Sequence, residues 1–202
     1  MKRCVIFDLA EVLIAGLPRC EAELAPVFGI APEAVLPGLR GEVMWAYNRG
    51  EITEDQYWAR TCEGNGWRGD VAEAKAVLRR NFARKVPGTE EVLRELAGRH
   101  RLFLLSDHGR EWIAHIRGLH GFLGLFERQF YSFDLGGIKT ERRTFEKVLA
   151  AIGAPASQCL FIDDHRPNVE AARLAGLDGI AFTNAAALRT ELVGRRLLEP
   201  AR

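Results

Sequence analysis

Apolar residues gather in five short runs along the chain, at positions 4–7, 102–105, 129–133, 160–162 and 179–182. Each run has the length of a strand and little polar interruption, which is typical of strands buried on both faces of a parallel sheet. The stretches between the later runs have a helical spacing instead, and positions 145, 148, 149 and 152 are apolar and share one helix face. This alternation predicts an α/β fold, a parallel sheet with helices on both faces.

The stretch 16–84 departs from this alternation. It is rich in helix formers and aromatic residues and contains no good strand. Thr53 followed by Gln56 has the spacing of a helix start with a reciprocal cap, and the helical character continues through 71–82. We therefore expect about four helices inserted after the first strand. This divides the chain into a discontinuous core, residues 1–15 and 85–202, and a helical cap, residues 16–84.

The charge balance and the cysteines argue against several classes of function. A net charge of +1 with acids and bases interspersed offers no patch for nucleic acid. The four cysteines lie far apart without a C-x-x-C pair, which favours neither a zinc site nor a disulfide framework and suits a reducing cytoplasm. No uncharged stretch reaches the ~18 residues that would predict a membrane span. We expect a cytoplasmic protein with no nucleic-acid or membrane partner, and the sequence leaves its oligomeric state open.

Polar residues stand where four of the predicted strands end, at the edge where parallel sheets bind ligands. They are Asp8 after the first run, Ser106, Asp107 and His108 after the second, Lys139 beyond the third, and Asp163 and Asp164 after the fourth. A carboxylate can attack phosphorus, carboxylates from separate strands can hold Mg²⁺, and a hydroxyl and an ammonium can bind phosphate oxygens. Each residue alone also fits a turn or a helix cap. Their shared position favours a site for phosphoryl transfer.

The order of these residues separates two families that handle phosphate. Receiver domains of two-component signalling have their acidic pair early in the chain and no helical insertion, whereas here the single aspartate comes first and the pair last. The segments VIFDLAEVL, LFLLSDHGREW, GGIKTERRTFEKVL and CLFIDDHRPNVEAARLAGL resemble the four successive motifs of the haloacid dehalogenase superfamily. The resemblance covers the whole chain and implies a Rossmann-like core with a helical cap between the first and second motifs.

The resemblance also implies a role for each residue that would meet the phosphate. Asp8 would be the nucleophile, and Lys139 would bridge this carboxylate and the phosphate. Ser106 and the backbone of Asp107 would bind phosphate oxygens. Asp107 stands where the family more often has Asn, and this change adds negative charge near the phosphate.

Magnesium is the cofactor that the resemblance implies. Its ligands would be Asp8, Asp164 and the backbone carbonyl of Ala10, with Asp163 behind them. The family's phosphatases usually have a second aspartate at the position of Ala10, to protonate the leaving oxygen and then activate water. One branch of small-molecule phosphatases has Gly there, and this sequence is closest to that branch. Because the metal ligand at this position is a carbonyl, Ala10 leaves magnesium binding intact.

Three hypotheses about function follow from the missing acid, whose loss typically costs ~10²–10⁴ in rate. The leading one is a magnesium-dependent phosphatase of small phosphorylated metabolites, acting through an aspartyl-phosphate on Asp8. A second, with the same fold, is a 2-haloacid dehalogenase in which Asp8 attacks carbon, although such enzymes normally carry Tyr where Ala10 stands. A third, from a different class, is a non-catalytic phosphate-binding or regulatory protein with a decayed site.

Further residues are candidates to border the site. Aromatic residues of the stretch 16–84 can form its roof, although aromatic residues among helices more often form core; they are Trp45, Tyr47, Trp58 and Trp67. His108 and His165 border the site and could titrate near neutral pH, or they could equally be partly exposed loop residues without a role in the chemistry. Glu11 follows the vacant acid position, and on an extended segment it would point to the other side, so we expect a structural role for it.

Overall fold

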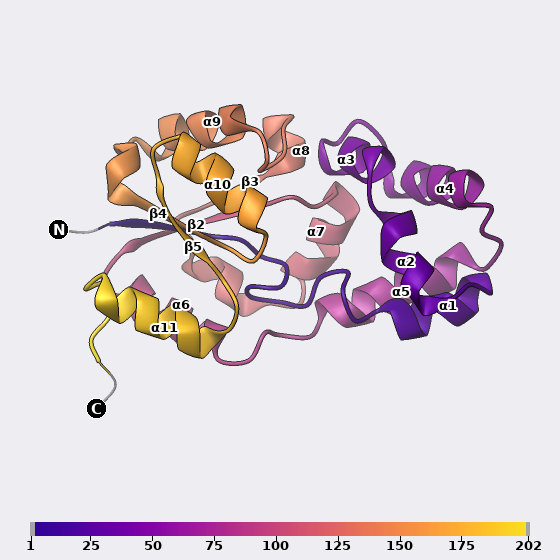
Figure 1. Ribbon diagram of the computed structural model, residues 1–202, viewed down its shortest axis with the longest axis horizontal. Helices are drawn as coiled ribbons and strands as arrows, with labels where there is room; N and C mark the ends of the chain where they lie inside the picture. The colour runs from indigo at the N-terminus through magenta and orange to yellow at the C-terminus, as the bar shows by residue number, and fades with distance from the viewer. Residues whose placement is uncertain (1–2, 201–202) are drawn as a thin grey trace.

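A five-stranded parallel sheet runs through the larger part of the molecule (Figure 1), with the strand order β3-β2-β1-β4-β5. The strands are β1 (Cys4–Phe7), β2 (Arg101–Ser106), β3 (Arg128–Tyr131), β4 (Cys159–Asp163) and β5 (Asp178–Ala181). The computed structural model describes residues 3–200, so the outermost ends of the predicted core, 1–2 and 201–202, lie outside the described residues. The predicted α/β fold is confirmed.

Helices cover both faces of this sheet because successive strand residues point to opposite sides. Ile6 and Phe103 pack on one side against helices of the upper layer in Figure 1, and Val5 and Leu104 pack on the other side. The upper layer contains α8 (Ser132–Leu135), α9 (Arg142–Ile152) and α10 (Arg166–Leu174). The other face carries α6 (Thr89–Ala97), α7 (Arg110–Arg117) and α11 (Ala185–Gly194). Two short 3₁₀ turns, Gly121–Leu125 and Ala156–Gln158, precede β3 and β4.

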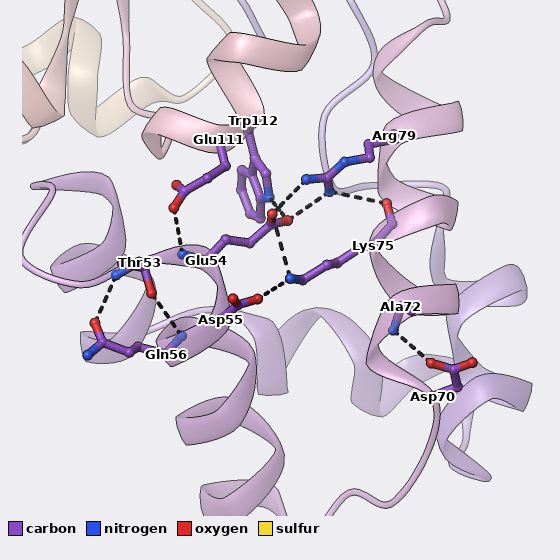
Figure 2. Close-up of polar contacts among 10 residues, drawn as sticks. All are labelled: Thr53, Glu54, Asp55, Gln56, Asp70, Ala72, Lys75, Arg79, Glu111 and Trp112. Atoms are coloured by element: carbon purple, nitrogen blue, oxygen red, sulfur yellow. Dashed lines mark hydrogen bonds and ion pairs between the residues drawn. The ribbon is translucent and has the colours of Figure 1, made fainter.

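The stretch 16–84 is helical, as expected, and its helices gather at one end of the molecule (Figure 1). They are α1 (Glu21–Phe28), α2 (Pro32–Leu39), α3 (Glu42–Asn48), α4 (Glu54–Asn65) and α5 (Val71–Phe82), one more than the four expected. The start of α4 has the predicted reciprocal cap: the Gln56 N–H donates to the Thr53 hydroxyl at 3.3 Å, and the Thr53 N–H donates to the Gln56 side chain at 3.0 Å (Figure 2). The predicted helix 71–82 matches α5.

Backbone hydrogen bonds join the two ends of the helical stretch. The Ala15 N–H donates to the Arg84 carbonyl at 2.8 Å, and the Val86 N–H donates to the Leu13 carbonyl at 3.0 Å. The chain therefore leaves the core and returns to it at the same place.

The far side of the helical stretch also contacts the core, through α3 and the residues after it. The Ser132 hydroxyl donates to the Asn48 carbonyl at 2.6 Å, and Arg49 forms an ion pair with Glu141 at 2.5 Å. A Cβ built on Gly109 would lie 1.9 Å from the Tyr47 ring, so only glycine allows this ring to lie against the loop that follows β2. Contacts at both ends hold the helical stretch over the edge of the sheet.

The third predicted strand was too long. Ser132 and Phe133, which we placed in strand 129–133, belong instead to the short helix α8. The Ser132 carbonyl accepts the N–H of Gly136, whose positive φ of 60° closes the turn, and an apolar side chain such as Phe133 fits a buried turn as well as a strand.

Among the described residues, no single helix is long and apolar enough to cross a membrane. Only α1 and α2 taken together reach that length and composition, and they meet at a bend of 91°.

Candidate active site

The parallel register brings the ends of β1, β2 and β4 to one edge of the sheet. Phe7 pairs with Leu104 and with Ile162, so Asp8 leaves the sheet between the ends of β2 and β4. Asp8 and Asp163 are both buried there, although charged groups are costly to bury without partners. The acidic residues that the sequence places at strand ends therefore do lie together at this edge of the sheet.

Lys139 supplies the positive charge of this cluster. Its Nζ lies 2.6 Å from Asp8 Oδ1 and 2.7 Å from Asp163 Oδ2, and the lysine is itself buried. Burial alone would lower the pKa of Lys139, but Asp163, Asp8 and Asp107 raise it above its usual value. The side chain is therefore a permanent ammonium beside the proposed nucleophile.

The acidic groups outnumber this one cation. One carboxylate oxygen from each of Asp8, Asp163 and Asp164 lies within 4.8 Å of the others. Burial raises the pKa of Asp8 well above its usual value, and repulsion from Asp163 and Asp164 adds to this, while Lys139 opposes it. Burial, followed by repulsion from Asp163, also raises the pKa of Asp164. The cluster has an excess of negative charge that a divalent cation would relieve.

The hydrogen bonds of Asp163 and Asp164 suggest different roles. Asp163 accepts from the His165 N–H at 2.7 Å, from the Asn168 amide at 3.1 and 3.2 Å, and from Lys139, so both of its oxygens are used. No other residue among 3–200 donates a hydrogen bond to the carboxylate of Asp164, which lines the cavity described below. Asp164 is thus free to ligate a metal, while Asp163 orients Lys139.

The segment after Asp8 forms a tight turn. The Ile14 N–H donates to the Leu9 carbonyl at 3.1 Å and the Glu11 N–H donates to the Ile14 carbonyl at 2.7 Å. Neither bond involves Ala10. Among residues 3–200, no hydrogen bond uses the Ala10 carbonyl. Free carboxylate and carbonyl oxygens are the ligands that Mg²⁺ prefers, so Asp8, Asp164 and the Ala10 carbonyl fit this ion.

Glu11 belongs to the same turn, with a positive φ of 57°. Its carboxylate accepts from the Gly16 N–H at 2.6 Å and from Arg19 at 2.8 Å. This is the structural role we expected, but the reason we gave was wrong because the backbone is a turn and not an extended segment. Glu11 fixes the loop that leads into the helical stretch.

Ser106 and Asp107, the predicted phosphate-binding pair, lie differently from each other. Ser106 is fully buried, and its Oγ lies 2.7 Å from Nδ1 of His108. Asp107 lines the cavity; its Oδ2 accepts the Lys139 N–H at 2.9 Å, and its buried Oδ1 has no hydrogen-bond partner. Burial raises the pKa of Asp107 to about 6, against the opposing effect of Lys139. A protonated Asp107 can therefore donate to an oxyanion, as the amide of the usual Asn would.

The expectation that His108 titrates near neutral pH was wrong. His108 is buried, and burial, aided by the charge of Lys139, lowers its pKa to about 3. The ring is therefore neutral, and in the tautomer with hydrogen on Nδ1 it donates to Ser106 Oγ. The Ser106 hydroxyl hydrogen then remains available for a phosphate oxygen. His165, in contrast, is exposed.

A cavity of about 410 Å³ opens above these groups, between the sheet edge and the helical stretch. Of the four aromatic residues we considered for its roof, Trp45 lines it, whereas Tyr47, Trp58 and Trp67 are buried in core. Sequence reasoning missed several other lining residues: Leu17, Pro18, Arg40, Met44, Asn48 and Ile138. The spacing of 41, 44, 45 and 48 on one helix face was the available signal, but it does not say whether that face meets core or cavity.

The geometry supports nucleophilic displacement at phosphorus. Asp8 lies beside a fixed ammonium, and the neighbouring backbone and hydroxyl groups are those that bind equatorial phosphate oxygens. A bound Mg²⁺ would add neutralisation of phosphate charge. The methyl group of Ala10 lies close to Gly16, and it carries no proton for a leaving group.

Comparison with known proteins agrees with this picture. The chain is 25% identical over 193 residues to the sesquiterpene phosphatase astK of Aspergillus oryzae, with 94% of each chain covered. It is 26% identical over 195 residues to the drimenol cyclase drtB of Aspergillus calidoustus, which covers 90% of this chain and 34% of the cyclase. The chain therefore spans about a third of the length of that second relative.

A solved structure gives the same fold. The haloacid dehalogenase family enzyme bt-2542 of Bacteroides thetaiotaomicron, solved in complex with magnesium and inorganic phosphate, is similar with a TM-score of 0.73 at 19% identity, covering 91% of this chain and 96% of that chain. The family model for haloacid dehalogenase-like hydrolases matches residues 2–176. Because that match extends over most of the sequence, the chain belongs to the haloacid dehalogenase-like hydrolases.

Proposed function

We propose that this protein is a magnesium-dependent phosphatase of small phosphate esters. The observation that carries the proposal is the placement of Asp8 against Lys139, with the free carboxylate of Asp164 beside them. One oxygen of Asp8 attacks phosphorus, the bond to the leaving oxygen breaks, and water then hydrolyses the aspartyl-phosphate. The leaving oxygen takes its proton from water or from a neighbouring group, because Ala10 has none to give.

The residue roles form part of this proposal. Asp8 is the nucleophile, Lys139 holds the nucleophile and the phosphate together, and Ser106 with the Asp107 backbone binds phosphate oxygens. The ligands of Mg²⁺ are Asp8, Asp164 and the Ala10 carbonyl, and Asp163 supports them. The two unshared oxygens near Asp8, one from Asp164 and one from Ala10, support the metal-dependent hypothesis over the dehalogenase, which needs no metal.

We also propose that residues 16–84 form a cap that closes over the site. The contacts of α3 and Arg49 with the core support this role. A cap excludes water and bulky substrates alike, so phosphoproteins should be poor substrates. The similarity to the sesquiterpene phosphatase astK, which covers 94% of each chain, supports a small organic phosphate as the substrate. The four cysteines, all free, are consistent with a cytoplasmic location.

A phosphatase assay with and without magnesium tests the proposal. We expect turnover of 4-nitrophenyl phosphate and acetyl phosphate with Mg²⁺, and loss of turnover with excess chelator. Turnover of these phosphates that survives chelation would contradict the magnesium requirement, and chelator-resistant turnover of a 2-haloacid in place of the phosphates would favour the dehalogenase hypothesis. Phosphate binding without turnover of any ester would favour the non-catalytic hypothesis.

A further inference from the structure

The helical stretch contributes mainly apolar side chains to the cavity that Asp8 lines. They are Leu17, Pro18, Met44 and Trp45, and from the core Ile138 adds a further apolar side chain. Asp8, Asp107 and Asp164 line the same cavity from the sheet edge. The cavity therefore combines groups suited to a phosphate and its metal with an apolar wall suited to a hydrocarbon.

Trp45 is unusual in this wall. It is 42% exposed, and only Leu119 and Leu174 are other large hydrophobic residues exposed in residues 3–200. The other aromatic residues of the helical stretch are buried in its core. An exposed tryptophan is costly to leave in water, and a ligand that covers it recovers this free energy. Because Trp45 lines the same cavity as the candidate nucleophile Asp8, the substrate is the ligand that would cover it.

Few polar groups are available in the same wall. Asn48 is more than nine-tenths buried, lines the cavity, and its Oδ1 has no hydrogen-bond partner. Arg40 is exposed and also lines the cavity. A sugar or a nucleoside has many hydroxyl or base groups, and each of these loses its water partners on entering such a wall. An apolar body with at most one hydrogen-bonding group does not have this cost.

We infer that the substrate is an amphipathic phosphate ester, whose apolar body lies against Leu17, Met44 and Trp45 while its phosphate meets Asp8 and Lys139. This inference rests on the proposed function and specifies the substrate class of the same site. The inferred specificity makes hydrocarbon phosphates good substrates and sugar phosphates and nucleotides poor ones. Asn48 would accept a hydrogen bond from a single polar group of the substrate.

The first test compares two phosphates of primary alcohols, hexyl phosphate and glucose 6-phosphate, so that the acidity of the leaving group is nearly matched. We expect kcat/KM to be at least about tenfold higher for hexyl phosphate, the factor that burial of a short hydrocarbon supplies. Equal values, or a preference for glucose 6-phosphate, would overturn the inference. Turnover of 4-nitrophenyl phosphate tests the proposed function separately.

The second test replaces the wall. Trp45→Ala should raise KM for hexyl phosphate about tenfold and leave acetyl phosphate, which has almost no body, unchanged. Trp45→Phe should keep most of the native KM. Leu174→Ala is the matched control because Leu174 is 73% exposed on α10 and lies outside the cavity lining. Equal effects of Trp45→Ala on both substrates would contradict the inference.

The third test needs no turnover. Hexylphosphonate should bind to the native protein and change its tryptophan fluorescence, and the change should shrink in Trp45→Phe. Glucose 6-phosphate should bind at least about tenfold more weakly. A fluorescence change on hexylphosphonate binding that is the same in the native protein and in Trp45→Phe would overturn the inference, even in a protein without phosphatase activity.

Discussion

Asp8 and Glu54 are both buried carboxylates, but neighbouring groups compensate their negative charge to different extents. Burial would raise the pKa of Glu54, but hydrogen bonds from Arg79 at 2.6 and 2.8 Å and from the Trp112 indole at 2.8 Å lower it overall (Figure 2). Asp8 has Lys139 beside it, yet its pKa is raised because Asp163 and Asp164 add repulsion to burial. One cluster is fully partnered and the other is not.

The difference indicates which cluster is structural and which is functional. Glu54 joins helices of both parts of the molecule, since Arg79 comes from α5 in the helical stretch and Trp112 from α7 in the core. Both of its oxygens accept hydrogen bonds from side chains of the protein. The excess negative charge around Asp8 is what a bound cation would relieve, as expected of a functional site.

Asp8→Asn should abolish phosphatase activity, by about 10⁴-fold or more, because the nucleophile is lost. The free energy of unfolding at pH 7 should not fall, since the amide removes repulsion from Asp163 and Asp164. Activity and urea unfolding measured on the same preparation check both statements. A large loss of stability would place Asp8 in the structural class with Glu54.

Ala10→Asp should restore a general acid and base to the unpartnered cluster. The gain could approach ~10²-fold for alkyl phosphates and should be small for aryl phosphates, whose leaving groups need little protonation. A series of esters with graded leaving-group pKa, run on both proteins, measures this difference. A flat dependence in the native enzyme, unchanged by the substitution, would show that another group already supplies the proton.

Glu54→Gln should destabilise the protein by about 2 kcal/mol, less than a fully buried pair because Arg79 is partly exposed. Asp55→Asn is the matched control: the neighbouring residue, on the same turn, also pairs with a cation, Lys75, but its side chain is 86% exposed. Its effect should be much smaller. Urea unfolding measures the stability of the two variants. Equal losses of stability would show that burial does not determine how much an ion pair stabilises the protein.

Asp107→Asn should change how anion binding depends on pH. The pKa of Asp107 is raised to about 6, so its carboxyl is neutral below that pH and becomes negative above it. Sulfate keeps one charge state across this range, and its affinity for the native protein should fall about three- to tenfold between pH 5 and 7. Calorimetry should find this fall absent in the variant, and an identical fall in both proteins would assign it to another group.

The sequence predicted the sheet and the acidic edge well because both depend on local signals. A short apolar run that ends in a carboxylate, such as the run before Asp8, places that side chain at the sheet edge whatever the rest of the chain does. The protonation of His108 could not be predicted, because the rings that pack against it in the loop after β2 come from two helices, Phe82 from α5 and Trp112 from α7. The turn at Glu11 was missed because the backbone hydrogen bonds that form it, such as the one from the Glu11 N–H to the Ile14 carbonyl, leave no mark on the pattern of apolar residues.

The cavity wall was the least predictable part. Met44 and Trp45 are neighbours on one helix, yet Met44 is buried and Trp45 is exposed. Their exposure depends on how α3 lies against α8, which no local pattern records. The helical stretch could be recognised from sequence, but the face that it turns toward Asp8 could not.

The hydrogen bonds between residues 13–15 and 84–86 also have a consequence for folding. They close a loop of about 70 residues, and the chain entropy lost on closing it is about 4 kcal/mol, by a logarithmic dependence on length. Doubling the insertion would add only about 0.6 kcal/mol to that cost. In chain entropy alone, the pairing of β1 with β2 is therefore nearly indifferent to the length of the segment inserted between them, and what limits a change of length is the packing of the inserted helices on the core.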